Sequence, residues 1–170
     1  MWRIRRQWQR FLRLSGWVAA EVWLVDNGPN VNPPMLATSN PTRRELLKLK
    51  KYGYTTILCL LDPKEQAPLY NVDKVIKDGW RWCNVPVPDY AAPTHEQIRS
   101  LISFFRKSKE GVVIHCQGGI GRTGTAATIY WLTKGLPPVE ALAAVREKQE
   151  WAVETQAQWQ AVLQARRVIR

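Results

Sequence analysis

The sequence predicts an α/β domain built around a central sheet of about five strands. Short runs rich in Val, Ile, Leu and Trp alternate with segments of helical periodicity from about residue 20 onward, a pattern typical of α/β proteins. The length of 170 residues and the hydrophobic share of 45% suit one domain, because a domain of this size buries roughly 70% of the surface that its unfolded chain exposes. We therefore expect a single domain over residues 20–170.

Five segments have the composition of β-strands. In chain order they cover residues 21–25, 35–39, 54–61, 80–87 and 111–115. The third and the fifth, YTTILCLL and GVVIH, are the most uniformly apolar of the five. Strands that are buried on both faces have this composition, so we expect these two in the middle of the sheet.

Helical patterns fill the intervals between the strands. The first helix is expected to begin at Asn40, with Pro41 in its first turn, and to stop at Gly53. Thr94 and Gln97 have the spacing of a capping box, which predicts that another helix begins there. The remaining patterns predict helices over about 70–78, 122–134, 138–149 and 155–169.

Residues 1–19 differ in character from the rest of the chain. Arginines at positions 3, 5, 6, 10 and 13 precede the first acidic residue, Glu21. On a helix that turns by about 100° per residue, most of these arginines lie opposite a face formed by Met1, Ile4, Trp8, Phe11 and Leu12. We expect a basic amphipathic helix here, which either packs on the domain or binds an anionic membrane surface through residues 1–14.

Composition limits the class of protein and its compartment. Three cysteines, with no pair spaced as CxxC, are too few and too scattered for a disulfide scaffold or a four-cysteine zinc site. No apolar run reaches the roughly 20 residues that cross a bilayer, so we expect a cytoplasmic protein, peripheral at a membrane if the first helix binds lipid. The net charge of +11 is compatible with a nucleic acid, a membrane or a phosphorylated partner.

A glycine-rich loop follows the fifth predicted strand directly, in the sequence HCQGGIGRTG over residues 115–124. Glycine lets successive backbone N–H groups turn toward one centre, and the helix that follows adds the positive end of its dipole. These two features predict a cradle for a phosphate group. Its backbone amides are expected from Gln117, Gly118, Gly119, Ile120, Gly121 and Arg122.

The side chains on this loop turn the prediction from binding to catalysis. The inward N–H groups and the Arg122 guanidinium favour the thiolate form of Cys116, which makes it a nucleophile. Arg122 can hold two phosphate oxygens with its planar fork and stabilise the transition state. We expect the Thr123 hydroxyl to donate to the Cys116 sulfur and so to ease departure of the thiolate, and His115 to orient the loop.

A thiolate that attacks a phosphate ester needs an acid to protonate the leaving oxygen. The candidate is Asp89 in PVPDYAAPT, at the end of the fourth predicted strand, which can then act as general base for water. Tyr90 beside it could flank the substrate. A module that only binds phosphate is the alternative, but binding requires Arg122 and the glycines and does not require Cys116, Asp89 and Thr123 together.

These residues resemble the cysteine-dependent protein tyrosine phosphatases, specifically the small atypical dual-specificity phosphatases. Residues 115–123 match the His-Cys, five-residue, Arg-Ser/Thr loop of that family, and VPDYAAPTHEQI (87–98) is similar to its general-acid loop. AVETQAQ (152–158) is similar to a segment before the last helix, in which Gln158 matches the second glutamine and Glu154 stands where tyrosine-specific members have another glutamine. The resemblance implies a mainly parallel sheet and hydrolysis of phosphomonoesters through a phosphocysteine, with no metal and no cofactor.

The resemblance also bears on the substrate. Lysines in the loop are typical of relatives that bind polyphosphorylated inositol lipids, whereas Gln117 and Ile120 here are uncharged. A phosphoprotein is therefore the expected substrate, with phosphotyrosine and also phosphoserine or phosphothreonine within reach of a shallow site. Lipid phosphates and RNA 5′ ends stay as alternatives, and the lack of a recognisable RNA-binding module disfavours nucleic acid.

Overall fold

The computed structural model describes residues 22–26 and 35–169, and the statements that follow concern those residues. It contains one sheet with the strand order β1-β2-β5-β3-β4. The bounds are β1 (Trp23–Asp26), β2 (Met35–Thr38), β3 (Tyr54–Leu61), β4 (Arg81–Val87) and β5 (Gly111–His115). The expected α/β fold is confirmed, and each predicted strand is present within two residues of its expected ends.

The parallel part of this sheet has four strands and not five. β2, β5, β3 and β4 run parallel to their neighbours, whereas β1 pairs antiparallel with β2 at one edge. β3 and β5 both lie in the interior of the sheet, as their uniformly apolar sequences predict. Because β2, β3, β4 and β5 point the same way, their carboxyl ends meet at one edge of the sheet, where α/β proteins bind ligands.

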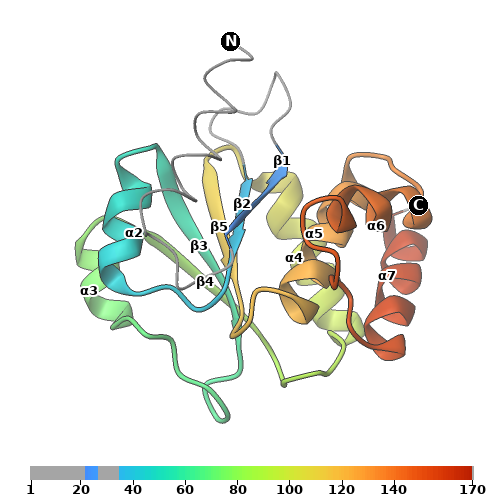
Figure 1. Cartoon of the computed structure of the whole chain (residues 1–170), viewed down its shortest axis with the longest axis horizontal. Coiled ribbons are helices and arrows are strands. Elements are labelled where there is room, and N and C mark those ends of the chain that lie inside the picture. The colour runs from blue at the N-terminus through green and yellow to red at the C-terminus, as the bar shows by residue number, and fades with distance from the viewer. Residues whose placement is uncertain (1–21, 27–34, 170) are drawn as a thin grey trace.

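Helices cover both faces of the sheet (Figure 1). One face carries α2 (Arg43–Lys50) and α3 (Val72–Lys77), and the other carries α4 (His95–Lys107), α5 (Gly121–Thr133), α6 (Pro138–Arg146) and α7 (Gln156–Ile169). Alternate side chains of β5 point to opposite faces of the sheet. Val113 packs in the core beneath α2 and α3, and Ile114 packs in the core beneath α4, α5, α6 and α7. This alternation follows from the two-residue period of a strand.

The helix ends show where the sequence prediction holds and where it fails. Thr94 and Gln97 form the expected capping box at the start of α4. The first helix, however, does not begin at Asn40: Thr42 is its N-cap and forms a capping box with Glu45, which satisfies the first backbone N–H groups in the way that Asn40 was expected to. The Asn40 side chain therefore does not cap the helix and can form hydrogen bonds elsewhere.

α6 ends at Arg146, three residues before the expected end. The Arg146 side chain donates hydrogen bonds to the carbonyls of Ala152 and Val153, which turns the chain back over α5. The contact is close, since a Cβ on Gly124 of α5 would lie 2.7 Å from that of Ala152. The polar residues between α6 and α7 are thereby held near the start of α5.

Ile76 lies in the expected helix over about 70–78 but is exposed on α3. The amphipathic helix over residues 1–19 lies outside the described residues, so its packing or its binding to a membrane through residues 1–14 stays a prediction. Within the described part of the chain, no helix has both the length and the apolar composition needed to span a bilayer.

Candidate active site

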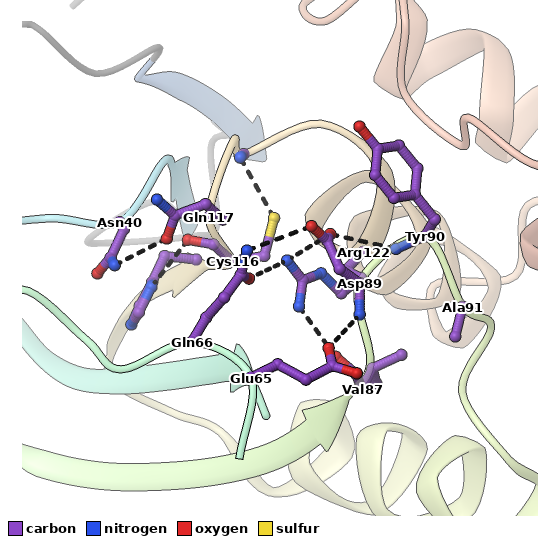
Figure 2. A network of polar contacts seen from close by, with 12 residues as sticks. Asn40, Glu65, Gln66, Val87, Asp89, Tyr90, Ala91, Cys116, Gln117 and Arg122 are labelled. Carbon is purple, nitrogen blue, oxygen red and sulfur yellow. Dashed lines mark hydrogen bonds and ion pairs between the residues drawn. The ribbon is translucent and has the colours of Figure 1, made fainter. Parts of the chain in front are cut away.

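The predicted site residues converge at the carboxyl edge of the sheet. Cys116 follows β5, and Asp89 follows β4 two residues after Val87. Asp89 and Cys116 are 27 residues apart in the sequence. Their segments are brought together because parallel strands β4 and β5 end at the same edge of the sheet. Figure 2 shows the polar contacts that join them.

Cys116 lies at the bottom of the loop and its side chain is nearly enclosed, with the residue 3% exposed. The backbone N–H of Gly119 donates to its sulfur over 3.2 Å. Such a donor stabilises a thiolate more than a thiol, because a hydrogen bond to an ionised acceptor is stronger. The predicted inward turn of the loop is thus present at Gly119.

Gly119 is held in place from two sides. Its φ of +76° is rarely adopted by residues with a side chain, and a Cβ here would lie 2.7 Å from the backbone nitrogen of Ser39. The indole N–H of Trp23 donates to its carbonyl oxygen over 3.2 Å. β1 and the end of β2 therefore fix the conformation of the loop around the sulfur.

α5 begins directly after the loop and directs its N-terminus toward it. The N-cap, Ile120, provides no side-chain hydrogen bond, and the first turn contains no acidic residue. The free N–H groups of a helix N-terminus and its dipole both attract anions. A phosphate in the loop would meet this positive end without competition from a carboxylate of the helix itself.

Arg122, in the first turn of α5, is the centre of the polar contacts in Figure 2 and is only 4% exposed. Its Nη1 donates to the carbonyl oxygen of Val87 over 3.0 Å. Its Nη2 donates to Oε1 of Gln66 over 2.8 Å and forms an ion pair with Oδ1 of Asp89 at 2.7 Å. The guanidinium and the Asp89 carboxylate, which the sequence predicted in one site, are in direct contact.

Asp89 has a more open environment than Arg122. Its side chain is 41% exposed, and its Oδ1 also accepts from the backbone N–H of Tyr90 over 3.1 Å. Oδ2 accepts from Nε2 of Gln66 over 3.2 Å, and the backbone N–H of Asp89 donates to Oε2 of Glu65 over 2.8 Å. The carboxylate is thus placed by side chains of the loop that follows β3.

Sequence reasoning missed three residues that organise this site: Asn40, Glu65 and Gln66. Nδ2 of Asn40 donates to Oε1 of Gln117 over 3.0 Å and to the carbonyl of Ala67 over 3.2 Å, while its Oδ1 accepts from the backbone N–H of Leu69 over 3.1 Å. Asn40 therefore ties the phosphate loop to the loop after β3. No motif marks these residues, although their positions just after the carboxyl ends of β2 and β3 are a usable signal.

His115 is fully buried beneath the loop, where a chain of hydrogen bonds positions it. The indole N–H of Trp82 donates to the Tyr70 hydroxyl over 3.1 Å, and that hydroxyl lies 2.8 Å from Nε2 of His115. Nδ1 of His115 lies 3.3 Å from the Cys116 carbonyl oxygen. Since the carbonyl is an acceptor, Nδ1 carries the proton and Nε2 accepts from Tyr70. His115 thus joins Tyr70 to the first carbonyl of the loop, and its role in orienting the loop stays a prediction.

Burial also sets the protonation states of the side chains in and around this hydrogen-bond network. It lowers the pKa of His115 to about 4, helped by the nearby Arg122 and opposed by the hydrogen bond with Cys116. Burial raises the pKa of Tyr70, so its hydroxyl keeps its proton. Burial likewise raises the pKa of Cys59, so that thiol stays protonated in the core. Only a neutral imidazole can accept from Tyr70 while donating to the loop.

The Thr123 hydroxyl does not make the contact that the sequence suggested. It is buried, and among the described residues it has no hydrogen-bond partner. The donor to the Cys116 sulfur is instead the Gly119 backbone N–H. The assistance of Thr123 to thiolate departure stays a prediction.

Gln158 and Tyr90 belong to a second set of contacts above the loop. Gln158 is fully buried in α7; its Oε1 accepts from the backbone N–H of Glu154 over 2.8 Å, and its Nε2 donates to the carbonyl of Ala91 over 3.3 Å. The Thr155 hydroxyl lies 3.4 Å from the Tyr90 carbonyl. Gln158 therefore fastens the segment that carries Asp89 to the start of α7.

Two residues in these segments have strained backbones. Tyr90 has a φ of +56° and Val153 one of +62°, a region that residues other than glycine seldom adopt. Such strain persists where the surrounding contacts enforce it, often at functional sites. The Tyr90 ring is exposed and extends away from Arg122 (Figure 2), so it is placed beside the site and not inside it.

Glu154 adds a second carboxylate next to the phosphate loop. The Oε2 of Glu154 rests against Gly121, where a Cβ would have to displace it. Among the described residues, His, Cys, Asp and Glu side chains form no group of three that could hold a metal ion. The site thus combines a thiol, an anion cradle, a guanidinium and carboxylates, which are the parts needed to displace a group from a phosphate.

Comparison with known proteins points to one family. Residues 30–169 match the model described as the Swiss Army Knife protein, DSP-PTPase phosphatase domain. An uncharacterized protein of Methanocaldococcus jannaschii is 34% identical over 122 residues, which cover 57% of this chain and 74% of the relative. A probable protein tyrosine phosphatase type IVA of Dictyostelium discoideum is 25% identical over 62% of this chain and 64% of its own.

Solved structures agree with the family match. The active form of Tk-PTP superposes with a TM-score of 0.72 and 29% sequence identity, over 89% of this chain and 98% of the other. PTPMT1 in complex with PI(5)P superposes with a TM-score of 0.75 over 88% of this chain and 96% of the other. Its identity of 17% shows a shared fold and no more.

Proposed function

Because this chain belongs to the dual-specificity (DSP-PTPase) family of cysteine-based phosphatases, we propose that it hydrolyses phosphomonoesters of proteins through a phosphocysteine on Cys116. The observation that carries the proposal is the enclosed Cys116 sulfur, with the Gly119 N–H directed at it and the N-terminus of α5 and Arg122 beside it. Each of these features favours an anion, first the thiolate and then the phosphate.

The first half of the reaction forms the enzyme intermediate. The Cys116 thiolate attacks phosphorus, the sulfur–phosphorus bond forms, and the bond to the leaving oxygen breaks. Arg122 stabilises the charge on the equatorial oxygens, together with the backbone N–H groups of the loop. Asp89, entering in its protonated form, gives its proton to the leaving oxygen, and the alcohol or phenol departs.

The second half releases phosphate. The Asp89 carboxylate takes a proton from a water molecule as that water attacks the phosphocysteine. The new oxygen–phosphorus bond forms, the sulfur–phosphorus bond breaks, and inorganic phosphate leaves with the thiolate restored. His115 touches the Cys116 carbonyl and lies beneath the loop, so it is a positioning residue.

Features on the rim of the site support a phosphoprotein substrate. The Gln117 amide is uncharged and is held by Asn40, and Ile120 adds no charge to the loop. Neither provides the cationic contacts that would select additional phosphate groups on an inositol ring. Tyr90 presents an exposed ring beside Asp89, which suits contact with a phosphotyrosine ring or with a peptide chain.

The phosphocysteine can be tested by trapping. We expect acid quenching during turnover to leave one phosphoryl group on the peptide that contains Cys116, as measured by mass spectrometry. The amount trapped should rise in an Asp89→Asn variant with an activated substrate, because hydrolysis of the intermediate loses its base. A label on another residue, or no label in an active enzyme, would contradict the proposed intermediate.

The substrate class can be tested with a panel of substrates that each contain one kind of phosphate ester. Phosphotyrosine, phosphoserine and phosphothreonine peptides of one sequence should be hydrolysed with higher kcat/KM than vesicles that contain phosphatidylinositol phosphates or an RNA with a 5′ phosphate. Free phosphate release is the measurement. Preference for the vesicles or the RNA would replace phosphoproteins by that alternative while leaving the cysteine chemistry unchanged.

A further inference from the structure

Gln66 contacts both Arg122 and Asp89 with its side chain. Its Oε1 accepts from Nη2 of Arg122 over 2.8 Å, and its Nε2 donates to Oδ2 of Asp89 over 3.2 Å. The two partners have opposite charge and opposite hydrogen-bonding character, and a carboxamide is the neutral side chain that offers one acceptor and donors on a single planar group. Reversing the amide would place a donor against the guanidinium and an acceptor against the carboxylate.

Arg122 must exchange a contact when it grips a phosphate. One N–H of Nη2 donates to Gln66, and Oδ1 of Asp89 lies 2.7 Å from the same nitrogen as an ion pair, whereas Nε–H has no partner among the described residues. A phosphate held in a bidentate grip through Nε and Nη2 would therefore bring its oxygen to the nitrogen that the Asp89 carboxylate now faces. The Asp89 carboxylate is the partner that a phosphate replaces, because both are anions and repel each other at the same donor.

We infer that Gln66 is a positioning residue that keeps Asp89 beside Arg122 while a phosphate group takes the place of Asp89 on Nη2. The inference deepens the proposed function and rests on it. When the direct ion pair is given up, Gln66 still bonds Nη2 through Oε1 and Oδ2 of Asp89 through Nε2. The acid is thereby held next to the phosphate group whose leaving oxygen it must protonate.

The segment that carries Gln66 is itself held to the phosphate loop. Asn40 bonds the carbonyl of Ala67, the next residue, and also the Gln117 side chain. On the other side, Glu65 accepts the backbone N–H of Asp89. Gln66 is therefore placed between two anchored neighbours, and its position does not depend on the Arg122–Asp89 contact alone.

The test is a double-mutant cycle with two substrates that differ in leaving group. Wild type, Gln66→Ala, Asp89→Asn and the double variant are compared on p-nitrophenyl phosphate and on phenyl phosphate, whose leaving group depends more on protonation. We expect Gln66→Ala to lower kcat/KM about 10- to 100-fold on phenyl phosphate and only a few-fold on p-nitrophenyl phosphate. In the Asp89→Asn background the same substitution should change kcat/KM by less than about threefold.

Two further variants serve as controls. Gln66→Glu keeps an acceptor for Arg122 but loses the donor to Asp89, so it should show the same leaving-group dependence as Gln66→Ala. Gln160→Ala removes an exposed glutamine on α7 and should leave both substrates unchanged. Equal losses on the two substrates, or a loss that persists in full in the Asp89→Asn background, would overturn the inference.

The cycle separates this inference from the proposed function. If wild type is active and the activity losses of Gln66→Ala and Asp89→Asn multiply in the double variant, the two residues act independently. That result would overturn the role of Gln66 and leave the proposed phosphatase activity unchanged. A folded wild type that hydrolyses neither substrate would overturn both. A leaving-group effect of Gln66→Ala that disappears without Asp89 supports the inference, and a merely structural role would not produce it.

Discussion

The two halves of the site are built differently. The half that carries Cys116 is buried and is fixed by the backbone, by Trp23 and by a chain of hydrogen bonds through His115. The half that carries Asp89 is exposed and is placed by side chains, chiefly Glu65 and Gln66. Arg122 lies at the boundary and contacts the second half through Gln66, Val87 and Asp89.

The two halves of the site have different tasks in the proposed reaction. Anion binding and attack require a fixed geometry with low reorganisation, which buried backbone donors provide. Proton transfer requires a carboxyl group that changes partners during the reaction, which exposed side-chain contacts permit. We therefore expect changes in the first half to affect folding and binding together, and changes in the second half to affect turnover while the protein stays folded.

The largest effect is expected at the boundary. Arg122→Lys replaces the planar fork by a single point charge and loses the geometry that holds two phosphate oxygens. We expect kcat/KM to fall about 10³-fold or more, with weaker inhibition by inorganic phosphate. Steady-state kinetics measure both. A loss below tenfold would mean that the loop amides alone hold the phosphate.

A large effect confined to turnover is expected in the exposed half. Asp89→Asn removes the transferable proton, so kcat/KM, which reports the first step, should fall about 10²- to 10³-fold on substrates with poor leaving groups and much less on those with good ones. Since the side chain is 41% exposed, the urea unfolding midpoint should shift little. Equal losses with all leaving groups would contradict the role of Asp89 as the acid.

The buried half is tested by Gly119→Ala. An added Cβ meets the backbone of Thr38 and Ser39 at a φ of +76°, so we expect the free energy of unfolding to fall by about 3 kcal/mol or more, together with loss of activity. Gly135→Ala is the matched control. It has a φ of +97° but no atom within 4 Å of the new Cβ, so only strain of about 1 kcal/mol should appear. Equal losses would show that backbone strain alone, and no clash, explains the first variant.

A smaller effect is expected from the titration of His115. Above pH 6.5 the imidazole is neutral in both the folded and the unfolded state, so it makes no pH-dependent contribution. Between pH 6.5 and the folded pKa of about 4, the unfolded state binds the proton and the folded state does not, so the free energy of unfolding should fall with pH by about 3 kcal/mol in total. Below about pH 4 both states are protonated and this loss levels off.

Urea unfolding at pH 7, 5.5 and 4.5 measures this slope. The only other histidine, His95, is exposed at the start of α4, so a His95→Gln variant should keep the same pH dependence. If His95→Gln removed the slope, the buried imidazole would not be its cause.

The sequence predicted the buried half of the site better than the exposed half. The strand, the glycine loop and the helix after it are contiguous, so residues 111–133 specify their own local structure and the positions of Cys116 and Arg122. Asp89 could be found because a stiff, proline-bounded loop follows a strand. The fold class was equally accessible, because uniformly apolar strands and capped helices are local signals.

The rest depends on contacts between distant segments. Asn40 looked like a helix cap because its side chain and the following proline suit that position, yet Thr42 takes the cap and Asn40 binds Gln117 and Ala67. Gln66 has no local pattern, since its function arises only where the carboxyl ends of β3, β4 and β5 meet. The missing Thr123 contact likewise depends on side-chain geometry, which spacing along the chain does not determine.

Cys116 is the nucleophile in the proposed reaction. Its role is tested most directly by hydrolysis of p-nitrophenyl phosphate in EDTA and reductant between pH 5 and 8, for wild type and for Cys116→Ser. We predict activity in wild type that EDTA does not reduce, and none in the variant, which should still bind inorganic phosphate through the loop and Arg122. Normal turnover by Cys116→Ser, or no turnover by a correctly folded wild type, would contradict the account.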